Sequence, residues 1–253
     1  MVSLIRLFVE PDLTGGAEIA LTREQHHYLT KVMRRGEGDE IAVFNGRDGE
    51  WRAALSNLSK KAGSLTVSAN RKAQSPEPDL WLVFSLLKRG PVDLIVEKAV
   101  ELGVSNLCPV ITERTNATRV KMDRLKTIAT EAAEQCGRIT VPEIGEPAKL
   151  ETLLAAWPED RGLVWLDETG SGAPIAEVMA ARPAGTPDAI LIGPEGGFSP
   201  AELALIDKNT YVTPASMGQR LLRAETACIA ALSTWQALAG DWQAARPAGL
   251  DSL

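Results

Sequence analysis

The sequence contains few of the residues that build covalent or metal-bound scaffolds. Its 253 residues include three cysteines, Cys108, Cys136 and Cys228, and two histidines, His26 and His27. Cysteines this few and this far apart exclude a disulfide framework and a CxxC metal knuckle, and they are typical of a reducing cytoplasm. Two histidines argue against a multi-histidine metal centre, so we expect no bound metal and interpret both as surface residues of a helix.

Long apolar runs and an excess of positive charge are also missing. No run of about 18 apolar residues occurs and no small-residue cleavage site follows the start, so we expect no membrane span, no signal peptide and a cytoplasmic location. Hydrophobic residues make up 45% of the chain and charged residues 24%, which excludes a long disordered protein. The net charge of −6 excludes a surface coated in basic residues.

The charge is nevertheless unevenly distributed. Residues 1–78 contain 11 Lys and Arg against 10 Asp and Glu, a net charge of +1, whereas residues 79–253 contain 16 against 23, a net charge of −7. A polyanion is therefore better accommodated in the front third of the chain. A difference of this size also arises by chance, so charge alone assigns no function.

Short strands dominate the front third. Alternating apolar and polar residues predict strands at 6–10, 17–21, 41–44, 50–55 and 64–68. Thr22 and Gln25 fit a capping box that begins a helix, which runs to about Met33. Short strands with one helix in such a segment predict a small barrel-like β domain. A polar stretch with two prolines then predicts a linker, which divides the chain into domains of residues 1–75 and 76–253.

Strands and helices alternate in the second domain. Strands are predicted at 80–87, 107–111, 162–167 and 189–192, and helices at 91–102, 122–136 and 224–238. The strands are continuously apolar, which is typical of a parallel sheet covered by helices on both faces. The chain is therefore predicted to be an α/β protein with a small additional β domain.

A glycine-rich turn, GPEGGFSP at residues 193–200, follows the last of these strands. Ser199 and Glu202 form a second capping box, with proline in the first helical turn. Ligands of α/β proteins bind at the carboxyl ends of strands, where glycines let them approach the backbone. Neither GxxxxGK[ST] nor GxGxxG is present, and Glu195 would repel a triphosphate. A positively charged ligand with hydrogen-bonding edges, such as S-adenosylmethionine, fits better; the alternative is a tight connection without a ligand.

Residues 216–226 place two arginines, Arg220 and Arg223, just before the last helix. Glu225, in its first turn, offsets the helix dipole. Arg223 stands at the unfavourable end of the helix for a cation, which indicates a functional use for this arginine.

The helix at 122–136 leads into a third charged segment. One polar face of it carries Glu131, Glu134, Gln135 and Arg138. The simplest interpretation is a solvated face with a Glu134–Arg138 ion pair. Cys136 looks core-facing, and with no histidine nearby in sequence it is a poor candidate nucleophile.

Three segments taken together resemble one family. EQCGR (134–138), IGPEGGFS (192–199) and MGQRLLRAET (217–226) match, in order and spacing, the RsmE family of bacterial 16S ribosomal RNA uridine N3-methyltransferases. The likeness extends over essentially the whole chain. It implies an N-terminal PUA-like barrel for RNA and a C-terminal SPOUT-class α/β domain with a deep trefoil knot. It also implies S-adenosylmethionine as cofactor and a homodimer.

The resemblance also implies roles for individual residues. Those assigned to the cofactor are Leu166, Gly193, Pro194, Glu195, Gly196, Gly197, Met217, Gly218, Leu221 and Leu222. Those expected to face the RNA or the partner subunit are Arg114, Glu134, Gln135, Arg138 and Arg223. In the small domain the candidate RNA-binding residues are Lys31, Arg34, Arg35 and Arg52, for which solvated charge is the alternative. Gln219 and Ala224 depart from the family, in which Pro and Thr are common, and Ala224 leaves no hydroxyl at its position.

The implied reaction is methyl transfer to N3 of uridine 1498 of 16S ribosomal RNA in the small ribosomal subunit. N3 carries a proton, so a base must remove it while an arginine stabilises the charge on the neighbouring carbonyl oxygens. Glu134 suits the base, and Arg138 or Arg223 suits the arginine. The alternatives are a SPOUT enzyme acting on another RNA position or a ribose 2′-OH, and a non-catalytic RNA-binding protein of ribosome assembly.

Overall fold

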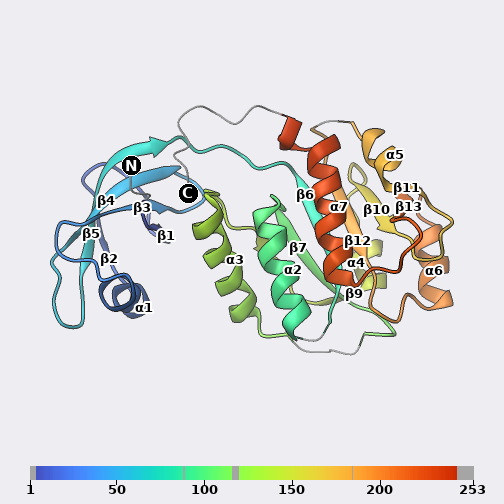
Figure 1. Cartoon of the computed structure of the whole chain (residues 1–253), viewed down its shortest axis with the longest axis horizontal. Helices are drawn as coiled ribbons and strands as arrows, with labels where there is room; N and C mark the ends of the chain where they lie inside the picture. The colour runs from blue at the N-terminus through green and yellow to red at the C-terminus, as the bar shows by residue number, and fades with distance from the viewer. Residues whose placement is uncertain (1–3, 88, 116–119, 184, 244–253) are drawn as a thin grey trace. The chain divides into compact units, whose positions relative to one another are not determined.

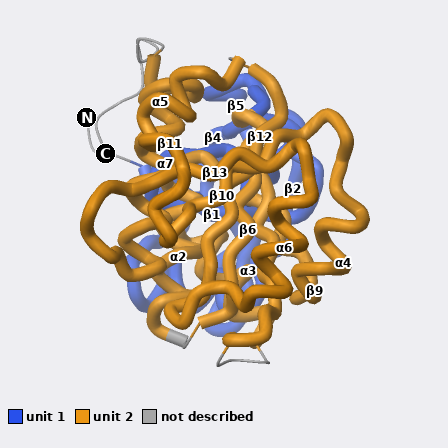
Figure 2. The backbone as a smooth tube through the Cα atoms, turned by 90° about the vertical axis from the view of Figure 1, so that its right-hand side faces the viewer, with its two compact units in different colours: residues 1–76, 133–141, 249–253 blue, residues 77–132, 142–248 orange. Residues whose placement is uncertain are grey.

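A computed structural model of the chain describes residues 4–87, 89–115, 120–183 and 185–243 (Figure 1). The chain forms two compact units, shown in different colours in Figure 2. Among the described residues, unit 1 holds 4–76 together with 133–141, and unit 2 holds the rest. Unit 1 therefore includes a segment from far along the chain, and that segment contains the sequence EQCGR.

Unit 1 is built on a five-stranded sheet with the order β1-β3-β4-β5-β2. Its strands are β1 (Arg6–Phe8), β2 (Glu18–Ala20), β3 (Glu40–Phe44), β4 (Glu50–Ser56) and β5 (Ser64–Lys72). β1 pairs with β3 in parallel, and the other pairs are antiparallel. Apolar side chains from these strands form one buried core, which includes Leu7, Ile41, Leu55 and Leu65. The predicted β-rich front third is confirmed.

One helical segment interrupts these strands. α1 (Arg23–His27) begins at the predicted capping box, in which the Gln25 N–H donates to Thr22 Oγ1 and the Thr22 N–H donates to Gln25 Oε1. The helix then widens into a π-helical turn, η1 (Tyr28–Val32). Soon after it, Arg34 adopts a left-handed backbone conformation with φ of 54°. The predicted helix is confirmed, but its second half has a geometry that periodicity does not reveal.

The surface position expected for His26 is wrong. Its side chain is buried, with 6% of the residue exposed, and Nε2 lies 3.2 Å from the Ser59 carbonyl oxygen. The turn after β4 covers this side of α1, and local sequence carries no sign of that contact. His27 is exposed, as expected.

Unit 2 contains an eight-stranded sheet in which every described pair is parallel, as predicted. The order is β11-β13-β10-β12-β6-β7-β8, and β9 also pairs with β7. The strands are β6 (Leu80–Ser85), β7 (Asn106–Ile111), β8 (Glu143–Ile144), β9 (Ala148–Lys149), β10 (Gly162–Leu166), β11 (Ala173–Pro174), β12 (Asp188–Ile192) and β13 (Val212–Ser216).

Helices cover both faces of this sheet. They are α2 (Arg89–Glu101), α3 (Met122–Cys136), α4 (Leu150–Ala155), α5 (Ile175–Ala180), α6 (Pro200–Asp207), α7 (Ala224–Leu238) and the 3₁₀ turn η2 (Asp241–Gln243). In Figure 2, α2, α5 and α7 lie on one side of the sheet and α4 and α6 on the other; α7 contacts α2 and α5, and α4 contacts α6. None of the described helices has the length and apolar character needed to cross a membrane.

β13 is the element that matters most for the site, and the sequence did not predict it. Its sequence, VTPAS, is polar and contains Pro214, which pairs opposite Trp165 of β10. β11 reaches only Ala215 and Ser216, so the other side of Pro214 has no strand neighbour among the described residues. A proline is tolerated at such an edge because no ladder hydrogen bond is required from its nitrogen.

Candidate active site

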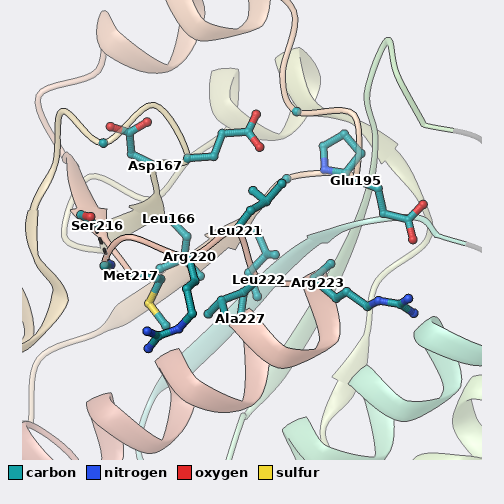
Figure 3. A pocket seen from close by; sticks show the side chains of 18 of the residues that line it. Leu166, Asp167, Glu195, Ser216, Met217, Arg220, Leu221, Leu222, Arg223 and Ala227 are labelled. Atoms are coloured by element: carbon teal, nitrogen blue, oxygen red, sulfur yellow. Dashed lines mark hydrogen bonds between the residues drawn. The ribbon is translucent and has the colours of Figure 1, made fainter.

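A cavity of about 570 Å³ opens at the carboxyl ends of three neighbouring strands, β13, β10 and β12 (Figure 3). Its walls are the loops that follow these strands and the first turns of α7, including Ala224 and Ala227. Cofactor and small-molecule sites commonly have volumes of about 300–1,000 Å³. The cavity lies where α/β folds bind ligands.

Glycines shape the loop after β12. A Cβ on Gly193 would come 2.8 Å from a ring carbon of Phe198, which is buried and meets Trp165 edge-on. Gly197 has φ of +68°, a conformation that other residues rarely adopt. Gly196 has no such restriction and is not among the lining residues. The predicted cofactor residues that do line the cavity from this loop are Gly193, Pro194, Glu195 and Gly197.

The loop after β13 forms the opposite wall. Gly218 has φ of +90°, and a Cβ placed there would meet no atom within 4 Å. Leu221 is 83% exposed, although it is a large apolar side chain beside a cavity. Exposed apolar groups next to a pocket are suited to covering a flat ring. From the predicted set, this loop contributes Met217, Gly218, Leu221 and Leu222, and β10 contributes Leu166.

Asp167 fixes the third wall. Its buried carboxylate accepts hydrogen bonds from the N–H groups of Thr169, Ser171 and Gly172, at 2.7–3.0 Å, and from the hydroxyls of Thr169 and Ser171. Burial on its own raises the pKa of Asp167, but these hydrogen bonds outweigh it and hold the pKa below its ordinary value of 3.8. The predictions omitted this residue. The sequence does contain a feature that could have revealed it: an aspartate directly after a buried strand, followed by the turn-forming residues Thr, Gly and Ser.

Charged side chains of both signs also line the cavity: Glu168, Glu195, Arg220 and Arg223. Arg223 occupies the N-cap position of α7, as predicted, and makes no side-chain capping hydrogen bond. Its positive charge therefore lies at the unfavourable end of the helix dipole, and no capping hydrogen bond offsets this cost. In Figure 3 Arg223 and Glu195 point to the same side, whereas Arg220 lies beside Met217.

Glu134, Gln135 and Arg138 are not among the lining residues, and they belong to unit 1. Glu134 Oε1 accepts the Phe8 N–H at 2.8 Å, and the Arg6 guanidinium donates to the carbonyl oxygens of Glu134 and Arg138. Arg138 is buried, and its Nε donates to Thr140 Oγ1. The interpretation of this face as solvated is therefore wrong for Arg138, which is buried, and for Glu134, which β1 partly covers, whereas Glu131 and Gln135 are exposed, as expected.

Arg114 lies against the glycine-rich loop of unit 2. Its Nη1 donates to the Gly196 carbonyl oxygen at 2.8 Å, although its side chain is exposed overall. This contact was not anticipated by the assignment of Arg114 to RNA.

The candidate RNA-binding residues of unit 1 differ in their surroundings. Lys31 and Arg34 are exposed on and just after the π-helical turn, and Arg35 is half-buried. Arg52 lies 3.3 Å from the Glu40 carboxylate, in an exposed ion pair that contributes little to stability. Lys31, Arg34 and Arg52 are thus all exposed, and Arg35 is the less accessible member of this set.

Metal and thiol chemistry find no support in the described residues. They include no group of three or more His, Cys, Asp or Glu side chains placed to hold a metal ion. Burial raises the pKa of Cys108 to about 11 and that of Cys228 to about 12. Both thiols are therefore protonated at neutral pH and poorly nucleophilic.

The fold and the cavity define an α/β enzyme of the kind that binds a small ligand at the strand ends, joined to a small β unit. The family model described as "RNA methyltransferase domain" matches residues 74–236, and "RNA methyltransferase PUA domain" matches 21–68. Ribosomal RNA small subunit methyltransferase E of Synechocystis is 32% identical, over 94% of this chain and 78% of its own length. The Bacillus subtilis protein of the same name is 29% identical, over 90% and 94%.

Solved structures agree with these matches. Ribosomal RNA small subunit methyltransferase E from Neisseria gonorrhoeae, bound to S-adenosyl methionine, superposes with a TM-score of 0.85 at 26% identity, over 94% of this chain and 99% of its own. A methyltransferase of Legionella pneumophila in complex with SAM gives 0.84 at 29% identity, over 93% and 98%. The chain belongs to the ribosomal RNA small subunit methyltransferase E family and is an RNA methyltransferase.

Proposed function

We propose that the chain transfers the methyl group of S-adenosylmethionine to N3 of uridine 1498 in the 16S RNA of the small ribosomal subunit. The cavity at the ends of β10, β12 and β13 carries this proposal, because two relatives of the same fold hold S-adenosylmethionine. The experiment that tests it identifies the nucleoside that the purified protein methylates in small ribosomal subunits.

The cavity suits this cofactor in shape and charge. On one wall Gly193 and Gly197 leave room for the Phe198 ring and the Glu168 carboxylate, and on the other Met217 and Leu221 offer apolar groups for an adenine. The carboxylate of Glu168 complements a sulfonium or an α-amino group. The cofactor, when bound, supplies an electrophilic methyl group, and the protein supplies placement and electrostatics.

The acceptor nitrogen needs help from the protein. With the cofactor bound, the bond from N3 to the methyl carbon would form as the sulfur–methyl bond breaks and leaves a neutral thioether, and the N3–H proton must pass to a base. The resulting charge is shared by the two adjacent carbonyl oxygens, which an arginine stabilises. We assign the base to Glu134 and the stabilising cation to Arg223 or Arg138. Because pairing hides N3, the target uridine must be unpaired or extruded.

Arg223→Ala is expected to lower kcat about 100- to 1000-fold, because it removes a donor aimed at charge that develops only in the transition state. S-adenosylmethionine affinity is expected to change little, and Arg223→Lys should restore part of the rate. Lys208→Ala, which removes an exposed cation of the same unit, is the matched control. Near-normal transfer by both Arg223→Ala and Glu134→Gln would contradict the assigned roles.

Unit 1 is proposed to hold the RNA through Lys31, Arg34, Arg35 and Arg52. Arg34→Glu with Arg35→Glu is expected to weaken binding to small ribosomal subunits and to flatten its salt dependence, because each lost phosphate contact lowers the slope of log K against log salt by about 0.7–0.9. Filter binding over a salt series measures both quantities. Lys60→Glu with Lys61→Glu makes the same charge change at exposed positions of the same unit. If both double substitutions weakened binding equally, RNA binding would depend on the overall charge of unit 1 and not on Arg34 and Arg35.

Further features of the family are proposed for this chain as well. They are domains of residues 1–75 and 76–253, a trefoil knot formed by the segment from β12 to α7, a homodimer and a cytoplasmic location. The likeness to the family supports the knot; the crossover from β12 to β13 past β10 is compatible with it and also occurs in unknotted parallel sheets. Light scattering of the purified protein tests the dimer.

A further inference from the structure

Two loops that are not neighbours in the sheet order are joined beside the cavity. β7 and β12 are separated by β6, yet the loop after β7 bonds to the loop and helix after β12. Arg114 Nη1 donates to the Gly196 carbonyl oxygen, and the Glu113 N–H donates to Glu202 Oε1, each at 2.8 Å. The loop after β7 therefore spans the end of β6 to reach the glycine-rich loop.

Glu202 serves both sides of this junction. Its Oε2 accepts the Ser199 N–H at 2.8 Å within the capping box that begins α6, and its Oε1 accepts the Glu113 N–H. One carboxylate thus fixes the end of the glycine-rich loop and the turn that carries Arg114. That turn is closed in itself, because the Thr112 N–H donates to Thr115 Oγ1 and the Thr115 N–H donates to the Thr112 carbonyl oxygen.

Arg114 holds the loop from the side that does not face the cavity. Gly196 is not a lining residue, whereas Glu195 and Gly197 on either side of it are. A Cβ built on Gly196 would lie 3.5 Å from Arg114 Cβ and 3.6 Å from its Cδ, so the arginine stem follows the loop at contact distance. Two consecutive glycines have a large conformational freedom, which would have to be lost on ligand binding.

We infer that Arg114 and Glu202 form a clamp that pre-organises the glycine-rich loop for the cofactor, so that Arg114 is a positioning residue and does not contact RNA. The inference rests on the proposed binding of S-adenosylmethionine. Pre-organised binding loops raise affinity because the free protein has already lost the freedom that binding removes.

Arg114→Ala is expected to raise the Kd and KM for S-adenosylmethionine about five- to tenfold, the effect of losing one hydrogen bond from an exposed side chain, with kcat at saturating cofactor unchanged. Arg114→Lys should recover part of this loss, since an ammonium can still donate to the Gly196 carbonyl. Affinity for small ribosomal subunits, measured without cofactor, should stay at the wild-type value. Arg124→Ala, which removes an exposed arginine of the same unit bound to Asp93, is the control.

Glu202→Gln provides the second arm, because an amide can accept only one of the two N–H groups. Arg114→Ala combined with Glu202→Gln should weaken cofactor binding by less than the product of the single effects, since both act through one loop. The inference holds only if cofactor affinity falls while RNA affinity is kept; any other pattern for Arg114→Ala overturns it. Wild-type protein that fails to bind S-adenosylmethionine would instead refute the proposed function.

Discussion

Arg6→Ala is expected to lower the free energy of unfolding by about 3–5 kcal/mol, the usual effect of removing one partner from a buried ion pair. The Arg6 side chain is 9% exposed, and its Nε donates to Glu50 at 2.6 Å. Its other nitrogens donate to the carbonyl oxygens of Ala133, Glu134 and Arg138, at the end of α3. Carbonyl oxygens at a helix C-terminus lack the full set of intrahelical N–H partners, so the arginine helps to satisfy those of Ala133 and Glu134 and complements the helix dipole. Its bond to the Arg138 carbonyl holds the turn that follows α3.

Arg71→Ala is the matched control for this prediction. Arg71 is the second partner of Glu50, at 2.7 Å, but its side chain is more exposed than that of Arg6, and its described hydrogen bonds include none to these carbonyls. It should therefore be clearly less destabilising in denaturant unfolding monitored by tryptophan fluorescence. Equal effects of the two substitutions would show that Arg6 acts only through Glu50 and does not anchor residues 133–138. Methyl transfer should fall with Arg6→Ala even where the protein is still folded.

Asp167→Ala is expected to weaken S-adenosylmethionine binding about 30- to 100-fold. The carboxylate satisfies the N–H groups of Thr169, Ser171 and Gly172, and an unsatisfied buried group costs about 1–3 kcal/mol. Without it the loop that carries Glu168 and Gly170 into the cavity wall would have to be ordered on binding. Isothermal titration of the variant measures the loss, and Asp160→Ala, an exposed aspartate before β10, is the control.

The pH dependence of this site follows from the lowered pKa of Asp167. The stabilisation that its charge provides is complete above the ordinary value of 3.8 and is lost only as the pH falls through the lower value in the folded protein. Cofactor affinity should therefore not decline through Asp167 between neutral pH and about pH 5. Asp167→Asn, which keeps the shape but replaces an acceptor oxygen with a donor, should bind weakly over that whole range. Wild-type affinity in Asp167→Asn would show that the charge is not required.

The sequence correctly predicted the features that depend on residues close together in the chain, namely helix caps, helix ranges and the glycine-rich turn. Both capping boxes form as predicted, and α3 and α7 occupy the predicted ranges 122–136 and 224–238. The glycine-rich turn lies at the carboxyl end of β12, beside the cavity. Capping and apolar periodicity act within a few residues, so one sequence is enough to recognise them.

Contacts between distant segments were not predictable in the same way. β13 was missed because Pro214, which has a strand neighbour on one side only among the described residues, and the polar residues beside it lower the strand signal. The contacts of Glu134 and Arg138 with β1 are not predictable until β1 is placed against the end of α3 through Arg6 and Phe8. The role of Arg114 likewise depends on a loop more than eighty residues further along the chain. Each of these contacts joins residues that are distant in sequence, and hydrophobic periodicity does not predict such contacts.

The most direct test of the account is to identify the nucleoside that this protein methylates. The protein is incubated with methyl-labelled S-adenosylmethionine and small ribosomal subunits that lack base methylation, and the RNA is then digested to nucleosides. Label is expected in 3-methyluridine alone, and about 30- to 100-fold more slowly with Asp167→Ala at low cofactor concentration. Label in another nucleoside or in a ribose 2′-O-methyl group would contradict the assignment to uridine N3, and no label despite cofactor binding would contradict the assigned substrate.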